Sequence, residues 1–352
     1  MKTKRSIYLV AALSLVALAS CKHDSEIFDG PDLNDLYGDF IIEQTFQANC
    51  DSVDFSILLQ KVNFSAVFSK PVDWQITITG LSSGAIKTVS GKSKTIDVSN
   101  STWNGSTTVF PMFNKENCAV MLSFPSEPDT LRDTVKIIET KIDAGFLIAD
   151  FNTGAPTGTS QISTYGQYTS DPPTPLPPTP TAFIQSGASM DFKAKNTETV
   201  AEGAYYYNMA GTVNWDWAIG LIEFPASTYS LTYFPLGTNP DNVYFNLLVW
   251  GEPGISNALL QFSFREDDNG NGVFNSGSDD EAVYEIKNIN WVGWKLVSIK
   301  YSGTTLSTNG NGLYNPEKIV SMRAFLLADP SSGFSKCKMD YMIFTANKPL
   351  EP

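Results

Sequence analysis

The sequence predicts an all-β protein built from two domains. Short runs in which apolar and polar residues alternate recur along most of the chain, and clusters of Gly, Ser and Asn separate these runs. No long stretch repeats its apolar residues with the period of an amphipathic helix. The chain has 352 residues, and at about 150 residues per domain this length fits two domains after an N-terminal targeting segment.

The N-terminal residues are predicted to be a targeting segment. Basic residues within the first five positions precede an apolar run over residues 7–19, which is too short to span a bilayer and has the length of a secretory signal core. The run ends in Leu18-Ala19-Ser20-Cys21, which resembles the lipobox of bacterial lipoproteins. The resemblance implies that residues 1–20 are a cleaved signal peptide and that Cys21 carries lipid that anchors the protein to a membrane. The alternative is a plain signal peptide followed by an incidental cysteine.

Residues 21–38 are predicted to be a tether, because they are acidic and interrupted by Gly, Pro and Asn. Directly after Cys21, residues 22–26 (KHDSE) are similar to the Lys-then-acidic export signal of Bacteroidetes-type surface lipoproteins. This similarity implies an outer-membrane protein that is lipid-anchored, faces the cell exterior and has outer-membrane uptake proteins as partners.

Composition excludes several classes of function. The formal net charge of −13 argues against nucleic acid as a partner, because phosphate binding depends on clustered Lys and Arg. His23 is the single histidine, and it lies close to the predicted cleavage site. A Ser-His-Asp triad, a Cys-His pair or a zinc site with several histidines is therefore not expected.

Residues 39–143 are predicted to form an Ig-like β-sandwich, because short alternating strands and regular turns are typical of that fold. The apolar residues that share one side of a strand are Phe64, Ala66 and Phe68 in one run and Trp74, Ile76 and Ile78 in the next. Cys50 and Cys118 both lie in this domain. They either pair in an oxidising compartment or stay as buried free thiols.

Residues 145–346 are predicted to form a second β-sandwich, a jelly roll. Residues 146–152 (FLIADFN) resemble the opening strand of galactose-binding-like jelly rolls, the fold of many carbohydrate-binding modules. Residues 337–344 (CKMDYMIF) resemble their closing strand, and residues 293–299 (GWKLVSI) resemble their Gly-Trp strand entry. Residues 171–180 contain six prolines and must be extended. With this resemblance they are interpreted as a loop inside the domain, and the alternative is an interdomain linker.

The second domain offers candidate glycan-binding residues on the non-core sides of three predicted strands, 243–250, 258–266 and 319–327. In these strands the core sides are assigned to Val243, Phe245, Leu247 and Val249, to Leu260, Phe262 and Phe264, and to Val320, Met322, Ala324 and Leu326. The candidates are Tyr244, Asn246, Trp250, Gln261, Arg265, Arg323 and Phe325, together with Trp291 beside a turn. Aromatic rings stack on the C–H faces of sugars, while amide and guanidinium groups bind hydroxyls. Burial of these side chains by loops or by the first domain is the alternative.

Residues 267–275 (DDNGNGVFN) match the start of a calcium-binding loop. Asp267, Asn269 and Asn271 supply alternating oxygens, and the next glycine permits the sharp turn. Ser278 stands where a bidentate Glu is usual, so the neighbouring Asp279 is predicted to complete a structural Ca²⁺ shell. The alternative is an acidic hairpin loop without a metal. The resemblance to carbohydrate-binding modules also implies a structural Ca²⁺ near the terminal strands, held by Asp150 and Asp340.

No enzymatic activity is expected. Glycoside hydrolysis needs two carboxyl groups placed across the scissile bond, and the chain lacks the Glu-x-Asp-x-x-Glu strand of jelly-roll glucanases. The sequence therefore predicts a non-catalytic cell-surface lipoprotein that binds polysaccharide or oligosaccharide and holds it near uptake or degradation machinery. The alternative is a structural or adhesion lipoprotein that binds a protein partner.

Overall fold

The computed structural model describes residues 38–352 except 58, 157–159, 163–190, 196–199, 213–217, 253–258, 288 and 328–333. The signal peptide, Cys21, nearly all of the tether and the Pro-rich residues 171–180 lie outside the described residues. Within the described part, the helical segments are 3-10 turns of three or four residues, so the all-β prediction is confirmed. None of the helices in these described ranges is long and apolar enough to cross a membrane.

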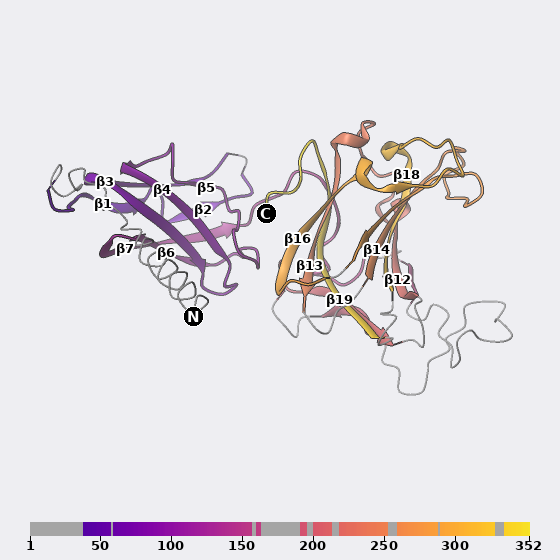
Figure 1. Ribbon diagram of the computed structural model, residues 1–352, viewed down its shortest axis with the longest axis horizontal. Helices are drawn as coiled ribbons and strands as arrows, with labels where there is room; N and C mark the ends of the chain where they lie inside the picture. Colours follow the sequence, from indigo (N-terminus) through magenta and orange to yellow (C-terminus); the bar gives the residue numbers. More distant parts are fainter. Residues whose placement is uncertain are drawn as a thin grey trace, which may run out of the picture.

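The first domain is built around one long strand. Its strands are β1 (Ile42–Ala48), β2 (Ser52–Asp54), β3 (Val62–Gly80), β4 (Ile86–Ile96), β5 (Thr102–Trp103), β6 (Asn117–Phe124) and β7 (Glu127–Glu139). The 19-residue β3 pairs with β1, β4, β5 and β6, and β2 pairs in parallel with β7 (Figure 1). Every second residue of β3 is buried, including Phe64 and Trp74, as the alternation predicted. The Ig-like topology of this domain stays a prediction.

The three cysteines of the described residues are free thiols. Cys118 is fully buried in the core of the first domain, whereas Cys50 is partly exposed. Burial raises the pKa of the Cys118 thiol to about 12, which keeps it protonated and unreactive. The structure therefore favours the free-thiol alternative over pairing of Cys50 with Cys118.

The second domain is a sandwich of two antiparallel sheets. The β13 sheet consists of β10 (Asp191–Lys195), β11 (Tyr206–Thr212), β19 (Phe334–Ala346), β13 (Val243–Gly251) and β16 (Gly293–Lys300) in this order, with β8 (Phe146–Ala149) paired to β19. The β14 sheet consists of β17 (Thr305–Leu306), β15 (Glu281–Ile286), β14 (Leu259–Glu266), β18 (Ile319–Leu327), β12 (Ala218–Pro225) and β9 (Ser160–Ile162) in this order. The predicted opening and closing strands are thus neighbours, β8 and β19.

The core of the second domain lies between these two sheets. Phe245 of the β13 sheet packs against Phe262 and Phe264 of the β14 sheet, with ring centroids 5.4 and 5.3 Å apart. The core sides predicted for β13, β14 and β18 are confirmed except at Val320, which lines a surface pocket instead. A register shift causes this difference, because β18 advances two residues from Ile319 to Ser321 while β14 advances one. Such a bulge reverses which side of the sheet a residue faces.

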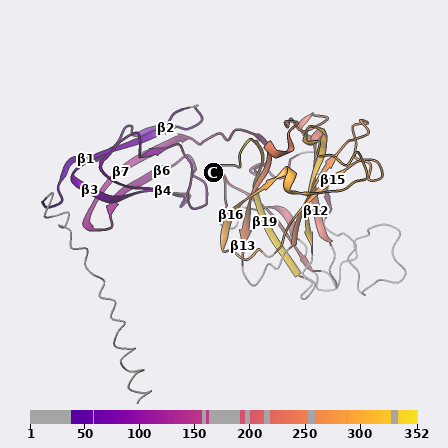
Figure 2. The same cartoon turned by 45° about the horizontal axis from the view of Figure 1, so that its top comes forward.

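The first domain packs against the outer side of the β13 sheet. Phe110 and Met112 of the first domain pack against a cluster that includes Leu248 and Trp294. The Met112 N–H donates to the Ala201 carbonyl at 2.7 Å. Figures 1 and 2 both show β13, β16 and β19 on the side of the first domain and β12 beyond them. The outer face of the β14 sheet is therefore the one turned away from the first domain.

Candidate functional site

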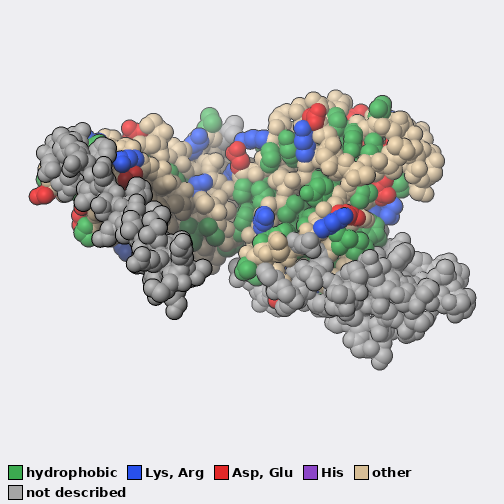
Figure 3. Space-filling model, in the orientation of Figure 1, with side chains coloured by type: hydrophobic (Ala, Val, Ile, Leu, Met, Phe, Trp, Pro, Cys, Tyr) green, Lys and Arg blue, Asp and Glu red, His purple; other side chains and the backbone are tan. Residues whose placement is uncertain are grey.

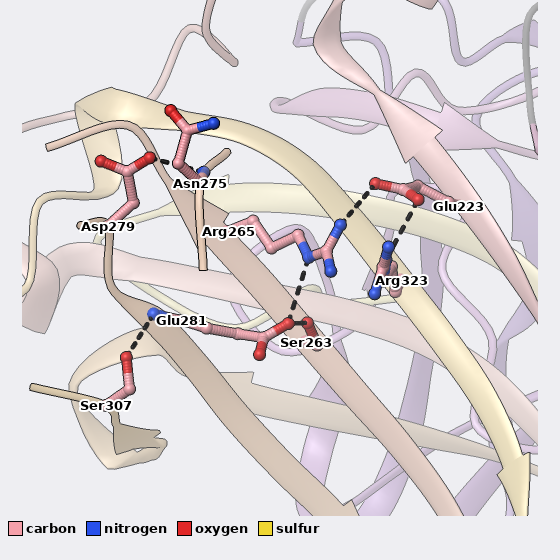
Figure 4. Close-up of polar contacts among 8 residues, drawn as sticks. All are labelled: Glu223, Ser263, Arg265, Asn275, Asp279, Glu281, Ser307 and Arg323. Atoms are coloured by element: carbon pink, nitrogen blue, oxygen red, sulfur yellow. Dashed lines mark hydrogen bonds and ion pairs between the residues drawn. The ribbon is translucent and has the colours of Figure 1, made fainter. Parts of the chain in front are cut away.

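A row of charged side chains crosses the outer face of the β14 sheet (Figure 4). Glu223 lies on β12, Arg323 on β18, Arg265 on β14 and Glu281 on β15. Each alternates with buried core residues on its strand, so all four side chains point away from the core. The strands place Glu223 opposite Arg323 and Arg265 opposite Glu281 as direct cross-strand neighbours.

The four side chains form a continuous chain of ion pairs. Arg265 Nε lies 3.2 Å from Glu281 Oε1, and Arg265 Nη1 lies 3.3 Å from Glu223 Oε1. Glu223 Oε2 in turn accepts from Arg323 Nε at 3.0 Å. The side chains of Arg265 and Glu223 are only 16% and 17% exposed, so the ion pair between them is shielded from water. Burial lowers the pKa of Arg265, and the nearby Arg323 lowers it further.

A second set of polar contacts extends this row along β14 and β15. Gln261 Nε2 donates to Glu285 Oε1 at 3.0 Å, and the Ser263 hydroxyl donates to Glu281. Lys287 Nζ lies 3.0 Å from Glu285 Oε2, and this hydrogen bond lowers the pKa of Glu285. The charges of this face are therefore paired and held in fixed positions.

Two open pockets flank β14 on this face. The Phe274 pocket has a volume of about 520 Å³ and is lined by Glu223, Arg265 and Phe274 among others. The Lys287 pocket has a volume of about 550 Å³ and lies over β15 and β17, where Glu281 and Lys287 line it. Because Arg265 and Glu281 join the two pockets, the row of ion pairs runs from one to the other.

Guanidinium groups in this row also lie against aromatic rings. The Arg265 Cζ atom is 4.3 Å from the centroid of the Phe274 ring, and the Arg323 Cζ atom is 5.7 Å from the centroid of the Phe325 ring.

Four of the eight predicted glycan-binding residues belong to strands of this one sheet. They are Gln261, Arg265, Arg323 and Phe325.

The other four predicted residues lie on or beside strands of the opposite sheet, so the structure does not bring all eight candidates onto one binding face. Tyr244, Asn246 and Trp250 are on β13, which belongs to the opposite sheet, and Trp291 immediately precedes β16 of that sheet. Alternation shows which side of a strand faces the core, but it does not show which sheet the strand joins. Because the outer sides of two stacked sheets point in opposite directions, the residues of β13 cannot share a face with those of β14.

Asn246 is not a surface residue. It is fully buried, and its amide donates to the Thr345 hydroxyl at 2.9 Å while its carbonyl oxygen accepts from the Leu350 N–H at 3.0 Å. Its role is to hold the C-terminal residues against β13. The expectation that Asn246 binds a ligand is therefore wrong, and Asn246 has a structural role instead.

The two candidate tryptophans on or beside the β13 sheet, Trp250 and Trp291, are engaged in packing. Trp250 makes an edge contact with Trp294 at 5.5 Å between centroids, and Lys338 Nζ lies 4.9 Å from its ring. Trp291 donates from Nε1 to the Val249 carbonyl at 3.2 Å and packs at the edge of the core. Both are half-buried.

Sequence reasoning missed Glu223, Glu281 and Phe274. Glu223 alternates with the buried Ile222 and Phe224, so the parity of β12 would have placed it on the outer face. Glu281 begins β15 directly after the predicted calcium loop, and sequence reasoning assigned no strand face to it. Phe274 lies in a loop, where no alternation exists to indicate the direction of a side chain.

The predicted calcium loop is held together by its own hydrogen bonds. Asp267 accepts from the Asn271 and Gly272 N–H groups at 3.0 and 2.7 Å, and Asp279 accepts from those of Asp268, Asn269 and Asn275. The side-chain oxygens (Oδ1) of Asn269 and Asn271 also accept hydrogen bonds from the N–H groups of Asn271 and Val273. Across the described part of the chain, no group of three or more acidic, His or Cys side chains is arranged to hold a metal. The carboxylate oxygens of Asp267 and Asp279 are therefore already bonded to backbone N–H groups of the loop.

Asp150 and Asp340, the second predicted calcium position, also accept hydrogen bonds from backbone N–H groups. Asp340 is fully buried and accepts from the N–H groups of Ala201, Glu202 and Tyr341 at 3.2, 3.1 and 2.8 Å. Burial raises the pKa of Asp340 well above its usual range. Asp150 accepts instead from the Asn152 N–H at 3.1 Å. Calcium binding at either position stays an untested prediction.

We expect the melting temperature of the protein to be the same in EDTA and in millimolar CaCl₂. The carboxylates of the loop already have backbone donors, so a cation would have to compete with those hydrogen bonds. A ligand that binds only the folded state raises the melting temperature once its concentration exceeds its dissociation constant, and further with each increase in concentration. A melt that shifts upward with CaCl₂ and is reversed by EDTA would instead support the Ca²⁺ prediction.

No basic patch is visible on the face of the molecule that Figure 3 shows. The Lys and Arg side chains of the described residues in that view are scattered among acidic ones.

The sequence matches no protein-family model and no curated relative. Similar solved structures include a family 11 carbohydrate-binding module from Clostridium thermocellum in complex with a β-1,3-1,4-mixed-linked tetrasaccharide, with 16% identity, a TM-score of 0.35, and coverage of 60% of this chain and 100% of that one. They also include SGBP-B from a complex xyloglucan utilization locus in Bacteroides uniformis, with 9% identity, a TM-score of 0.33, and coverage of 87% and 73%. Identities and TM-scores this low do not establish a shared ligand.

Proposed function

We propose that this protein binds neutral glycan, without turning it over, on the outer face of the β14 sheet. The observation that carries the proposal is the shielded row of Glu223, Arg323, Arg265 and Glu281, which joins two open pockets on a face that the first domain leaves free. Ligand sites are typically concave and combine apolar walls with a few fixed polar groups, and this face has both.

The two arginines have donors left for a ligand. Arg265 uses Nε and Nη1 in its ion pairs, and Arg323 uses Nε, so the remaining guanidinium N–H groups can meet sugar hydroxyls. The carboxylates hold both guanidinium planes in place, which reduces the entropy lost when a ligand binds. Phe325 and Phe274 supply apolar surface beside them for the C–H faces of a sugar ring.

The same ion pairs argue against catalysis. Glycoside hydrolases need one carboxyl group that protonates the leaving group and a second that acts as nucleophile or as base toward water. Arg265 holds both Glu223 and Glu281 in ion pairs. A role in holding polysaccharide near uptake or degradation machinery therefore suits the face better than hydrolysis.

The proposal also includes display on the cell surface, and the support for this part comes from the sequence alone. The lipobox-like residues that end at Cys21 and the tether that follows would anchor the chain to the outer membrane. The first domain would then separate the glycan face from the membrane.

Affinity electrophoresis of residues 22–352 tests glycan binding. We expect retardation in a gel that contains one of four neutral polysaccharides, namely xyloglucan, mixed-linkage β-glucan, xylan or galactan. We expect none with polygalacturonate, because the arginines are already neutralised and the fragment, with 21 Lys and Arg against 37 Asp and Glu, carries a net charge of −16 that repels an anionic polymer.

Trp250→Ala serves as the control, since Trp250 lies on the opposite sheet and this variant should be retarded like the wild type. Loss of retardation in Trp250→Ala alone would move the site to the β13 sheet. Absence of retardation in all of these gels would favour the second candidate, a structural or adhesion protein.

A further inference from the structure

Two loops of the second domain share one sequence pattern. Residues 269–275 read NGNGVFN and residues 309–315 read NGNGLYN, so each has two Asn-Gly pairs, an aliphatic residue, an aromatic residue and a final Asn. The first loop joins β14 to β15, and the second joins β17 to β18. The aliphatic residues Val273 and Leu313 are exposed in both. The shared pattern indicates that the two loops fold by the same local rules.

Two adjacent buried aspartates hold one loop each. Asp279 accepts from the N–H groups of Asn269 and Asn275 at 3.0 and 2.6 Å, at the two ends of the first loop. Asp280 accepts from those of Gly310 and Gly312 at 2.9 and 2.6 Å, in the second loop. Both aspartates are completely buried. Each carboxylate therefore fixes the backbone of its own loop.

The aromatic side chains of the two loops pack in different places. Tyr314 makes an edge contact with Tyr301, at 5.5 Å between centroids, and its hydroxyl donates to the Thr304 carbonyl. Phe274 instead lines the Phe274 pocket, with the Arg265 guanidinium 4.3 Å from its ring centroid. Only the first loop thus presents its aromatic ring to the proposed glycan face.

We propose that Phe274 is a specificity-determining aromatic residue of the glycan site and that Asp279 is its positioning residue. This inference rests on the proposed function. A ring held in place before the ligand arrives loses little conformational freedom on binding, and the adjacent guanidinium is attracted to the same ring. The loop, rather than the strands alone, then determines which sugar face the pocket accepts.

Phe274→Ala should weaken binding of the polysaccharide that retards the wild type by about tenfold, because the variant loses the stacking surface. Phe274→Tyr keeps the ring and should retain most of the affinity. Leu313→Ala is the control, since Leu313 is exposed in the second loop, at the position that corresponds to Val273, and does not line the pocket. Equal affinity of Phe274→Ala and the wild type would refute the role of Phe274 and leave glycan binding by the strands intact.

Asp279→Asn and Asp280→Asn form a matched pair for the positioning role. Each amide replaces an acceptor oxygen by a donor that faces backbone N–H groups, so both variants should lower the melting temperature. We expect only Asp279→Asn to weaken glycan binding, because Asp280 holds the loop of Tyr314. Equal loss of affinity in the two variants would overturn the positioning role of Asp279.

Hydrogen exchange measured by mass spectrometry tests positioning without any glycan. Asp279→Asn should speed exchange of the amides of residues 269–275, and Asp280→Asn that of residues 309–315. Unchanged exchange of residues 269–275 in Asp279→Asn would refute the positioning role. If the loops respond as expected but no polysaccharide retards the wild type, the proposed function fails while the loop mechanism stands.

Discussion

Arg265→Ala is expected to abolish retardation by glycan and to lower the free energy of unfolding by about 2–4 kcal/mol. Arg265 is the shared partner of Glu223 and Glu281, both of which are largely shielded from water. Without the guanidinium, Glu281 loses its ion pair and Glu223 keeps only Arg323, so uncompensated negative charge remains on the face. The Phe274 ring also loses its neighbour at 4.3 Å. Urea denaturation and affinity electrophoresis measure the two effects separately.

Two further variants separate charge from geometry in this experiment. Arg265→Lys keeps the positive charge but lacks the planar fork that reaches both carboxylates, so it should recover part of the stability and little of the binding. Arg132→Ala, on β7 of the first domain, is the control and should change neither property. Wild-type affinity in Arg265→Ala at a reduced melting temperature would show that the row of ion pairs stabilises the sheet and does not bind glycan.

Asn246→Ala is expected to lower the free energy of unfolding by about 2–4 kcal/mol and to leave glycan affinity unchanged. The amide of Asn246 bonds to Thr345 and Leu350, and its truncation leaves buried donors and acceptors without partners. The C-terminal residues that it holds also contact the first domain, where the Thr107 N–H donates to the Pro352 carbonyl at 2.9 Å. Limited proteolysis should therefore release the C-terminal residues faster in the variant.

Thr345→Val provides a graded comparison for Asn246→Ala. It removes one of the hydrogen bonds to the Asn246 amide and should lower stability by a smaller amount. An Asn246→Ala protein with an unchanged melting curve and no retardation by glycan would contradict the structural role and restore Asn246 as a ligand residue.

Local patterns in the sequence predicted the fold class and most of the core. Alternation correctly assigned Phe245, Phe262 and Met322 to the core, because side chains on a strand alternate between its two faces wherever the strand lies. It failed at Val320, where a bulge inserts one residue. The sequence alone gives no signal for such an insertion between distant strands.

The candidate site was predicted only in part for a related reason. Arg265 and Arg323 were assigned to outer faces, and the pairing of β14 with β18 brings them together. The same alternation assigned Asn246 to an outer face. However, β13 belongs to the other sheet, and the outer face of that sheet is partly covered. Sheet membership depends on hydrogen bonds between segments far apart in the chain. Phe274 was missed because the carboxylate of Asp279, and not a strand, sets its direction.

The outward orientation of the β14 sheet has a consequence for the proposed surface display. Because the first domain packs on the β13 sheet, a long polymer lying across the β14 sheet does not collide with the molecule's own first domain. Under the proposed surface display, neighbouring molecules in the same membrane would then bind successive stretches of one polymer. Such multivalent attachment strengthens overall binding by about 10²- to 10⁴-fold without any new contact. A low affinity at each single site would thus suffice to retain the polymer.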